Sequence, residues 1–339
     1  MRLLIIGGSS FLGRAIAEEA LRRGDSVTTF NRGLSDADVD GVETLRGDRT
    51  SDADLAKLAG REFDAVVDTC GFVPEVVSRS AAVLRDSGAF YAYVSSMSAT
   101  TTWPVATTPD NAPGQDCPSD AGPDDGDYGK LKAGCERAVT ETFGDRALVV
   151  RSGLIIGPHE NVGRLPWWLT RIARGGEVLA PGDPDVPMQL VDARDLAAFM
   201  LDAALAGTGG TVNATGPRGN ATMGSWLADC VTATSSGATL TWVADDLLLA
   251  SEVEPWTELP LWMPPGQEAD HVWDSDTAEA ERLGLRCRQV TETVHDTWKW
   301  LQEVGGVQPG QPPRRYLDPH GIDPDKEARI LAEHHRLAG

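Results

Sequence analysis

The amino-acid sequence predicts an α/β fold in which a doubly wound parallel sheet is followed by a smaller C-terminal lobe. The chain opens on a short apolar strand, a glycine turn and an amphipathic helix. Short apolar strands then alternate with helical segments as far as Arg151. Beyond Gly157 and Pro158 this regularity falls and tryptophans accumulate, which indicates a lobe woven around the sheet.

Composition bounds the classes of function. With 339 residues, of which 41% are hydrophobic, the chain can fill one large core with a smaller lobe. A net charge of −21 repels phosphate backbones, so we expect no nucleic-acid partner, and self-association into a homodimer is left open. The sequence has no apolar run of membrane-spanning length and no signal-peptide pattern at its start, so we expect a cytoplasmic protein without a membrane partner. Five scattered cysteines and six histidines show no ligand spacing, and no metal site is expected.

The first strand, Arg2 to Ile6, ends at a glycine turn that leads into a helical stripe through Arg23. Glycine permits close backbone approach, and a helix N-terminus offers free N–H groups to a pyrophosphate. This context predicts a Rossmann-type dinucleotide site. The residues expected to bind the nucleotide there are Gly7, Gly8, Ser9, Ser10, Phe11, Leu12 and Gly13.

The second strand, Ser26 to Phe30, ends at Asn31 and Arg32. At this place an acidic residue favours NAD, whereas an arginine accommodates the 2′-phosphate of NADP. Because no acid follows the strand directly, Asn31 and Arg32 favour NADP as the cofactor, with NAD as the alternative.

Further strands are expected at Glu43 to Arg46, Asp64 to Asp68 and Phe90 to Ser95. The carboxyl ends of parallel strands share one edge of the sheet, where ligands bind in folds of this class. We therefore place a common rim of the site at the residues that end these strands. They are Cys70, Gly71, Phe72, Ser95 and Ser96.

Tyr128 and Lys132 open an amphipathic helix that is expected to run to Phe143. Residues four apart lie on one helix face, so the phenol and the ammonium can share a small volume. A nearby cation favours the phenolate and would lower the pKa of the tyrosine, which makes the pair suitable for proton transfer.

The segment from Thr100 to Asp127 is rich in Thr, Pro, Asp and Gly and predicts a long loop, either a lid or plain surface. Three parts of the chain are expected. They are a dinucleotide-binding core over 1–160, a mixed segment over 161–307 that completes the core and forms the substrate lobe, and a linker with a C-terminal helix over 308–339.

The glycine turn, Ser96 and the Tyr128/Lys132 pair, in this order, resemble the short-chain dehydrogenase/reductase superfamily, and in particular its extended, NAD-dependent epimerase/dehydratase-like branch. The resemblance covers roughly residues 1–215. It implies that Ser96 orients the substrate oxygen, that Tyr128 exchanges its proton, and that Lys132 supports Tyr128 and holds the nicotinamide ribose. It further implies that Asp48 contacts adenine and that Asp195 is structural.

The sequence departs from this branch at three positions. Ser10 replaces the middle glycine of the turn, as in an atypical subgroup. Leu154 and Met188 stand where enzymes acting on nucleotide-diphosphate sugars carry an asparagine and an arginine. Two apolar residues in place of two polar anchors argue against a nucleotide-diphosphate sugar as substrate.

These observations favour an NAD(P)-dependent oxidoreductase that transfers hydride between nicotinamide and a small, rather apolar carbonyl, alcohol or imine, with Tyr128 as the proton donor or acceptor. Two alternatives stay open: an epimerase or dehydratase with tightly bound, recycled NAD, and a non-catalytic cofactor-binding module. The residues expected to contact the substrate are Phe72, Ser96, Leu154, Trp167 and Met188.

Overall fold

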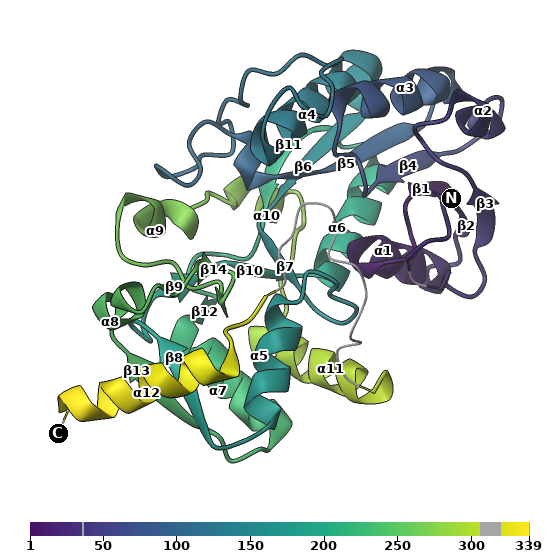
Figure 1. Ribbon diagram of the computed structural model, residues 1–339. Helices are drawn as coiled ribbons and strands as arrows, with labels where there is room; N and C mark the ends of the chain where they lie inside the picture. The colour runs from purple at the N-terminus through teal and green to yellow at the C-terminus, as the bar shows by residue number, and fades with distance from the viewer. Residues whose placement is uncertain (36, 306–319, 339) are drawn as a thin grey trace.

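A computed structural model describes residues 1–35, 37–305 and 320–338. Its largest sheet is parallel throughout, in the order β11-β6-β5-β4-β1-β2-β3, and it confirms the predicted Rossmann-type fold (Figure 1). The strands are β1 (Arg2–Ile6), β2 (Ser26–Asn31), β3 (Glu43–Arg46), β4 (Ala65–Asp68), β5 (Phe90–Ser96), β6 (Ala147–Ser152) and β11 (Gly210–Ala214).

Helices cover both faces of this sheet (Figure 1). One face carries α1 (Phe11–Arg22) and α6 (Ala193–Ala206), and the other carries α2 (Asp52–Leu55), α3 (Pro74–Leu84) and α4 (Tyr128–Phe143). Successive strand residues alternate between the faces. Ile5 therefore packs with the α1 and α6 side, whereas Leu4 packs with the α3 and α4 side.

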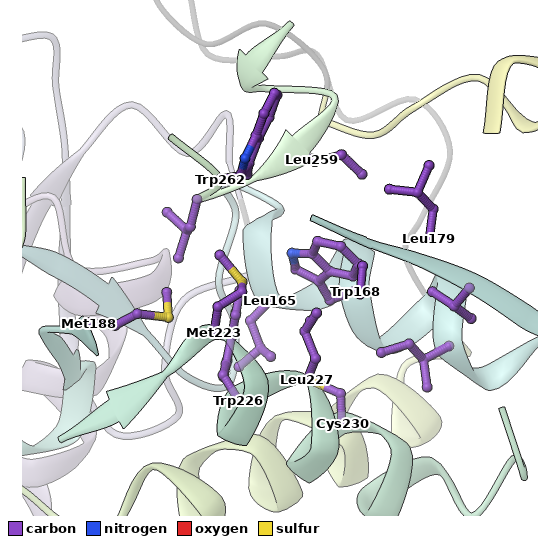
Figure 2. Packing of buried hydrophobic residues seen from close by; sticks show 14 of the residues in the cluster. Leu165, Trp168, Leu179, Met188, Met223, Trp226, Leu227, Cys230, Leu259 and Trp262 are labelled. Atoms are coloured by element: carbon purple, nitrogen blue, oxygen red, sulfur yellow. The ribbon is translucent and has the colours of Figure 1, made fainter. Parts of the chain in front are cut away.

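The C-terminal lobe has its own hydrophobic core around Trp168 and Trp226, two fully buried side chains (Figure 2). Its longer elements are α5 (Arg164–Ala173), β8 (Glu177–Pro181), α7 (Met223–Thr234), β13 (Thr239–Val243), α11 (Val290–Glu303) and α12 (Pro324–Ala338). The shorter elements are β7 (Leu154–Ile156), β9 (Pro187–Met188), β10 (Leu190–Asp192), β12 (Ala221–Thr222), α8 (Asp245–Ala250), β14 (Pro255–Trp256), β15 (Leu259–Pro260), α9 (Gln267–Val272) and α10 (Ala278–Arg282).

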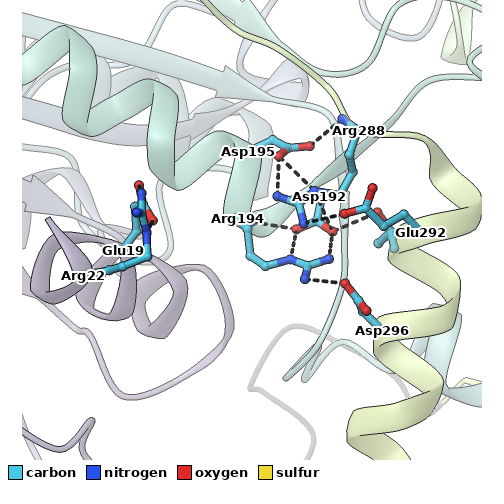
Figure 3. A network of polar contacts seen from close by, with 9 residues as sticks. Glu19, Arg22, Asp192, Arg194, Asp195, Arg288, Glu292 and Asp296 are labelled. Atoms are coloured by element: carbon cyan, nitrogen blue, oxygen red, sulfur yellow. Dashed lines mark hydrogen bonds and ion pairs between the residues drawn. The ribbon is translucent and has the colours of Figure 1, made fainter.

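A network of ion pairs joins the start of α6 to α11 and the segment before it (Figure 3). Arg194 pairs with Asp192 at 2.7 Å and with Asp296 at 2.6 Å. Asp195 accepts from the Arg288 guanidinium at 2.6 Å and from the Arg288 backbone N–H at 2.8 Å. These contacts attach α11 to the helix that covers the sheet, and they agree with the structural role that the resemblance implies for Asp195.

Predicted and observed boundaries agree best where a helix is capped. Helix α4 begins at Tyr128 as predicted, since the Asp127 side chain accepts the backbone N–H of Lys130. The predicted helix over 324–338 also matches α12. The predicted linker over 308–315 lies outside the described residues. Within the described ranges, no helix is long and apolar enough to cross a membrane.

Candidate active site

The glycine turn between β1 and α1 has the backbone geometry that the sequence predicts. Gly7 and Gly8 have φ angles of 111° and 95°, which disfavour residues with a Cβ. A Cβ on Gly13 would lie 2.8 Å from the Gly8 nitrogen, so the helix can approach the turn only because residue 13 is glycine. Phe11 opens α1 at φ 40°, a strained conformation of the kind found at functional sites.

The same turn has the features of an anion site. The first turn of α1 contains no acidic residue, and its free N–H groups carry the positive end of the helix dipole. Ser10 precedes the helix, and its Oγ is buried without a hydrogen-bond partner in the described structure. A pyrophosphate would supply acceptors for these donors, so the residues present fit a dinucleotide.

At the end of β2 the chain folds back and places Asp38 beside Asn31. The Asn31 amide donates to Asp38 Oδ1 at 3.1 Å and to the Gly7 carbonyl at 3.3 Å. Partial burial opposes ionisation of Asp38, but hydrogen bonds from Arg46 and Asn31 outweigh it and lower the pKa of the carboxyl. Arg32 is exposed and lies 4.0 Å from Asp48. The NADP prediction rests on the absence of an acid directly after β2. Because the chain folds back, Asp38 nevertheless places a carboxylate at the end of this strand.

Behind this region a buried ion pair supports the ends of β3 and β4. The Arg49 guanidinium donates to both carboxylate oxygens of Asp68 at 2.8 Å and lies 3.8 Å from the Cys70 sulfur. Asp48 accepts the Thr50 backbone N–H and hydroxyl, which lower the pKa of its carboxyl. Cys70 Sγ donates to the Ile6 carbonyl at 3.4 Å, so it lies at the glycine turn as predicted.

Lys132 is held at the centre of the rim. Its side chain is buried, and Nζ donates to the Gly71 carbonyl at 2.9 Å and to the Val94 carbonyl at 2.6 Å. Nζ also lies 4.4 Å from the centre of the Tyr93 ring and 5.4 Å from that of Phe72. An ammonium has three N–H donors, and these two carbonyls leave one for a ligand or for Tyr128.

The two serines at the end of β5 occupy different environments. Ser95 is buried and donates to Glu136 Oε1 at 2.5 Å, and Glu136 is paired with Arg151 at 2.7 Å. Ser96 is partly exposed, and its Oγ accepts the Ser98 backbone N–H at 3.2 Å. The geometry therefore favours Ser96 over Ser95 as the hydroxyl that can reach a ligand.

Tyr128 is 44% exposed and stands at the first turn of α4, one turn from the buried Lys132. The next residue, Gly129, packs directly on the carbonyl of Ser98. Ser98 belongs to the short helix η3 (Met97–Ala99) that follows Ser96. The fold thus brings the start of α4 against Ser96 and the short helix η3 that follows it, together called the serine turn below. The predicted arrangement of Ser96, Tyr128 and Lys132 requires this contact.

The loop over 100–127, called the strap below, is attached to both the lobe and α4. The Thr108 N–H donates to the Asp274 carbonyl, and the Trp103 indole donates to the Val272 carbonyl, so this half of the loop is attached to the lobe. Farther along, Cys117 and Pro118 pack on Gly134 in the middle of α4. The segment therefore joins α4 to the lobe, an attachment that the sequence, which left a lid and a plain surface loop open, did not predict.

The residues predicted to contact the substrate lie in different environments in the structure. Phe72 lies beside Lys132 on the rim. Leu154 is 8% exposed within the lobe core. Met188 has no exposed surface, so the contact with a substrate is not available to it. Trp167 is half-buried on α5, where it packs against Gly321 near the C-terminus, and its predicted role stays a prediction.

A cavity of about 650 Å³ is lined by Asp110, Arg151, Glu279 and Arg282, among others, and by none of the predicted site residues. The described residues contain no cluster of three or more His, Cys, Asp or Glu side chains that could hold a metal ion.

A comparison with known families agrees with both the fold and the order of the motifs. Residues 3–214 match the model of the NAD dependent epimerase/dehydratase family. The chain belongs to this family. None of the curated proteins compared with the chain matches it significantly.

Solved structures of this family share the architecture at low identity. A UDP-glucose 4-epimerase is 13% identical, with a TM-score of 0.66 over 91% of this chain and all of its own. The Bordetella bronchiseptica enzyme WbmH in complex with NAD⁺ is 16% identical, with a TM-score of 0.65 over 90% of this chain and 99% of its own. The UDP-glucose 4-epimerase of Thermotoga maritima is 15% identical, with a TM-score of 0.65 over 90% and 99%.

The sequence did not reveal three residues that lie near the predicted site of this epimerase/dehydratase family member. Asp38 reaches the end of β2 only because the chain folds back, and no local pattern marks it. Gln115 comes from the irregular loop and donates to the Ser98 carbonyl at 2.8 Å. Gly129 could have been suspected, because a residue without a side chain directly after Tyr128 permits a close approach.

Proposed function

We propose that this protein is an epimerase-type enzyme that binds NAD tightly and uses Tyr128 to remove a proton from a substrate hydroxyl and then return it. The observation that carries the proposal is the arrangement of Lys132, held by the Gly71 and Val94 carbonyls, at the rim shared by the glycine turn and the serine turn. The family match supports the recycled nucleotide over a net reductase.

The residues divide the chemistry as follows. A dinucleotide held by the glycine turn and Lys132 would supply the hydride chemistry, which removes hydride from the substrate carbon and returns it to the opposite face. Ser96 holds the substrate oxygen: its Oγ accepts the Ser98 backbone N–H, and its own hydrogen, which donates to Ser98 Oγ at 3.3 Å, would turn to the substrate when one binds. Tyr128 takes the hydroxyl proton as the C=O bond forms and returns it when the hydride comes back. Lys132 places a positive charge one helical turn from Tyr128.

The substrate we propose is small and rather apolar. At the two positions where enzymes acting on nucleotide-diphosphate sugars carry an asparagine and an arginine, Leu154 and Met188 pack into the lobe core, so these polar anchors for a diphosphate are missing. The N-terminus of α5 is already capped by the buried Glu160, whose Oε1 accepts the Arg164 N–H at 2.9 Å. Burial raises the pKa of Glu160, and an incoming phosphate would compete with its carboxyl for the same N–H groups. Met97 and Ser98 follow Ser96, so this turn offers no carboxylate for the elimination of water that a dehydratase needs.

The experiment starts from the purified protein. We expect denaturation to release about one NAD⁺ per chain, and incubation with small alcohols or carbonyl compounds to cause no net change in nucleotide. Tyr128→Phe should lower conversion of the best compound by on the order of 100-fold or more while nucleotide stays bound. Lys132→Ala should lower it too, whereas the control Lys130→Ala, on the same helix, should not. No conversion of any compound by the parent, with NAD⁺ still bound, would leave a non-catalytic cofactor-binding module as the explanation. Unchanged conversion in Tyr128→Phe would show that Tyr128 is not the proton-transfer group.

Within this proposal the nucleotide is NAD rather than NADP. Asp38 places a carboxylate near the expected ribose, where it accepts a 2′-hydroxyl and repels a 2′-phosphate. We expect NAD⁺ to bind more tightly than NADP⁺ and Asp38→Asn to narrow the difference. Tighter NADP⁺ in the parent, reversed by Arg32→Ala, would instead support the NADP-dependent reductase.

That reductase is the second candidate, and the exposed Arg32 is the observation that favours it. It predicts net oxidation of NADPH by a carbonyl compound and little nucleotide retained on purification. The two candidates therefore differ in the released nucleotide before any substrate is known.

A further inference from the structure

The start of α4 and the serine turn approach each other more closely than side chains allow. A Cβ on Gly129 would lie 2.2 Å from the carbonyl oxygen of Ser98 and 2.7 Å from Gln115 Nε2. Ordinary van der Waals contact begins near 3.4 Å. Residue 129 directly follows Tyr128, and Ser98 lies two residues after Ser96.

Gln115 closes this junction from the third side. Its Nε2 donates to the same Ser98 carbonyl at 2.8 Å, and its backbone N–H donates to the Ala99 carbonyl. An isolated antiparallel β-bridge pairs Thr100 with Gly114, the residue before Gln115. The strap is therefore hydrogen-bonded to the serine turn at the point where α4 touches it.

We propose that Gly129, Gln115 and the Ser98 carbonyl form a spacing device that sets the distance between Tyr128 and Ser96. Gly129 and Gln115 are positioning residues, since they act through Tyr128 and Ser96. The inference rests on the proposed proton transfer and deepens it. It also gives the strap a role, because the strap is attached to the lobe through the Thr108 N–H and the Asp274 carbonyl.

Helix stability alone would favour a different residue at this place. Alanine is a better helix former than glycine. Gly129 lies in a helix without a positive φ angle, so no backbone strain calls for glycine there. The close contact with Ser98 is the physical reason that a side chain is excluded.

The chain offers a matched control in the same helix. A Cβ on Gly134 would lie 2.6 Å from Pro74 Cγ, 2.7 Å from Cys117 Sγ and 2.8 Å from the Pro118 carbonyl. Gly134→Ala therefore presses on the strap to a similar degree as Gly129→Ala presses on the serine turn, but it does so away from Tyr128 and Ser96.

The test compares crystal structures of the NAD⁺-loaded parent, Gly129→Ala and Gly134→Ala. In Gly129→Ala we expect the Tyr128 Oη to Ser96 Oγ separation to increase by about 1 Å, and kcat for the best compound of the panel above to fall on the order of 100-fold at similar NAD⁺ affinity. Gly134→Ala should keep both the separation and kcat. An unchanged separation in Gly129→Ala, or equal losses in both variants, would overturn the proposal.

A second pair of variants keeps the test decisive if Gly129→Ala does not fold. Gln115→Glu can donate to the Ser98 carbonyl only when protonated, so its kcat relative to the parent should recover as the pH falls, whereas Gln115→Ala should stay low at every pH. Parallel pH profiles in the two variants would contradict the role of Gln115. If these variants fail while Tyr128→Phe still abolishes conversion, the spacing device is wrong and the proposed function stands.

Discussion

At the scale of single residues, Ser95 and Ser96 are neighbours with opposite roles. Ser95 completes a buried network with Glu136 and Arg151, whereas Ser96 faces the rim. Ser95→Ala should therefore lower the free energy of unfolding by about 1–3 kcal/mol, because it leaves a buried carboxylate oxygen with fewer partners. Ser96→Ala should lower kcat and should cost less stability than Ser95→Ala, since it removes only the cap that Ser96 Oγ provides to the Ser98 N–H in a partly exposed turn. Urea unfolding and turnover, measured on both variants, would contradict this assignment if the two effects were exchanged.

A single residue, Glu19, is also expected to make the stability of the protein depend on pH. Glu19 on α1 accepts from Arg22 and Arg23, and the hydrogen bond from Arg22 contributes most to lowering its pKa from 4.5 to about 2 (Figure 3). Because the folded-state pKa is depressed, this stabilisation is present above about pH 4.5 and is lost as the pH falls towards 2.

Glu19→Gln should thus be less stable than the parent near neutral pH by up to about 1 kcal/mol, a modest value because the pair is partly solvated. The two proteins should converge as the pH approaches 2. Unfolding curves recorded across this range check the prediction, and a constant difference at every pH would contradict it.

The sequence placed Lys132 on α4 and the glycine turn between β1 and α1, where the structure has them, and the roles assigned to these residues stay predictions. It missed Asp38 and Gln115, which reach the site through folded loops with no periodic pattern. It placed Met188 at the substrate because the family position suggested it, whereas the side chain packs inside the lobe.

At the scale of elements, α12 closes the lobe through one buried carboxylate. Glu327 pairs with Arg171 at 2.7 Å and accepts the Leu179 backbone N–H at 3.1 Å, while Ile330 and Leu331 enter the lobe core. Glu327→Ala would leave Arg171 without its partner and should lower the free energy of unfolding by about 3–5 kcal/mol.

Glu327→Gln is the matched variant, since its amide oxygen can still accept from Leu179. We expect an intermediate loss of stability, and hydrogen exchange over 324–338 should rise in the order parent, Gln, Ala. Equal exchange in all three proteins would show that Glu327 does not hold the helix in place.

Helix α4 was predictable to the residue because Asp127 caps it and its apolar stripe is regular. The strap was not, since its attachment depends on contacts such as the one between Trp103 and Val272, 169 positions apart. A segment without periodicity predicts a loop but not the surface on which that loop lies.

At the scale of the whole molecule, the parallel sheet with helices on both faces follows from the alternation of strands and helices and from the right-handed rule for parallel crossovers. The lobe was recognisable only as a change of pattern. Its two-residue strands, such as β9 and β12, exist through tertiary pairing, which local propensity does not encode.

The central claim is that one rim unites the nucleotide turn with the proton-transfer pair. The most direct measurement is a crystal structure of the protein with bound NAD⁺. The account predicts the pyrophosphate at the N-terminus of α1, the nicotinamide ribose within hydrogen-bond distance of Lys132 Nζ, and the nicotinamide ring beside Tyr128. A nucleotide bound elsewhere, or a nicotinamide ring turned away from Tyr128, would contradict it.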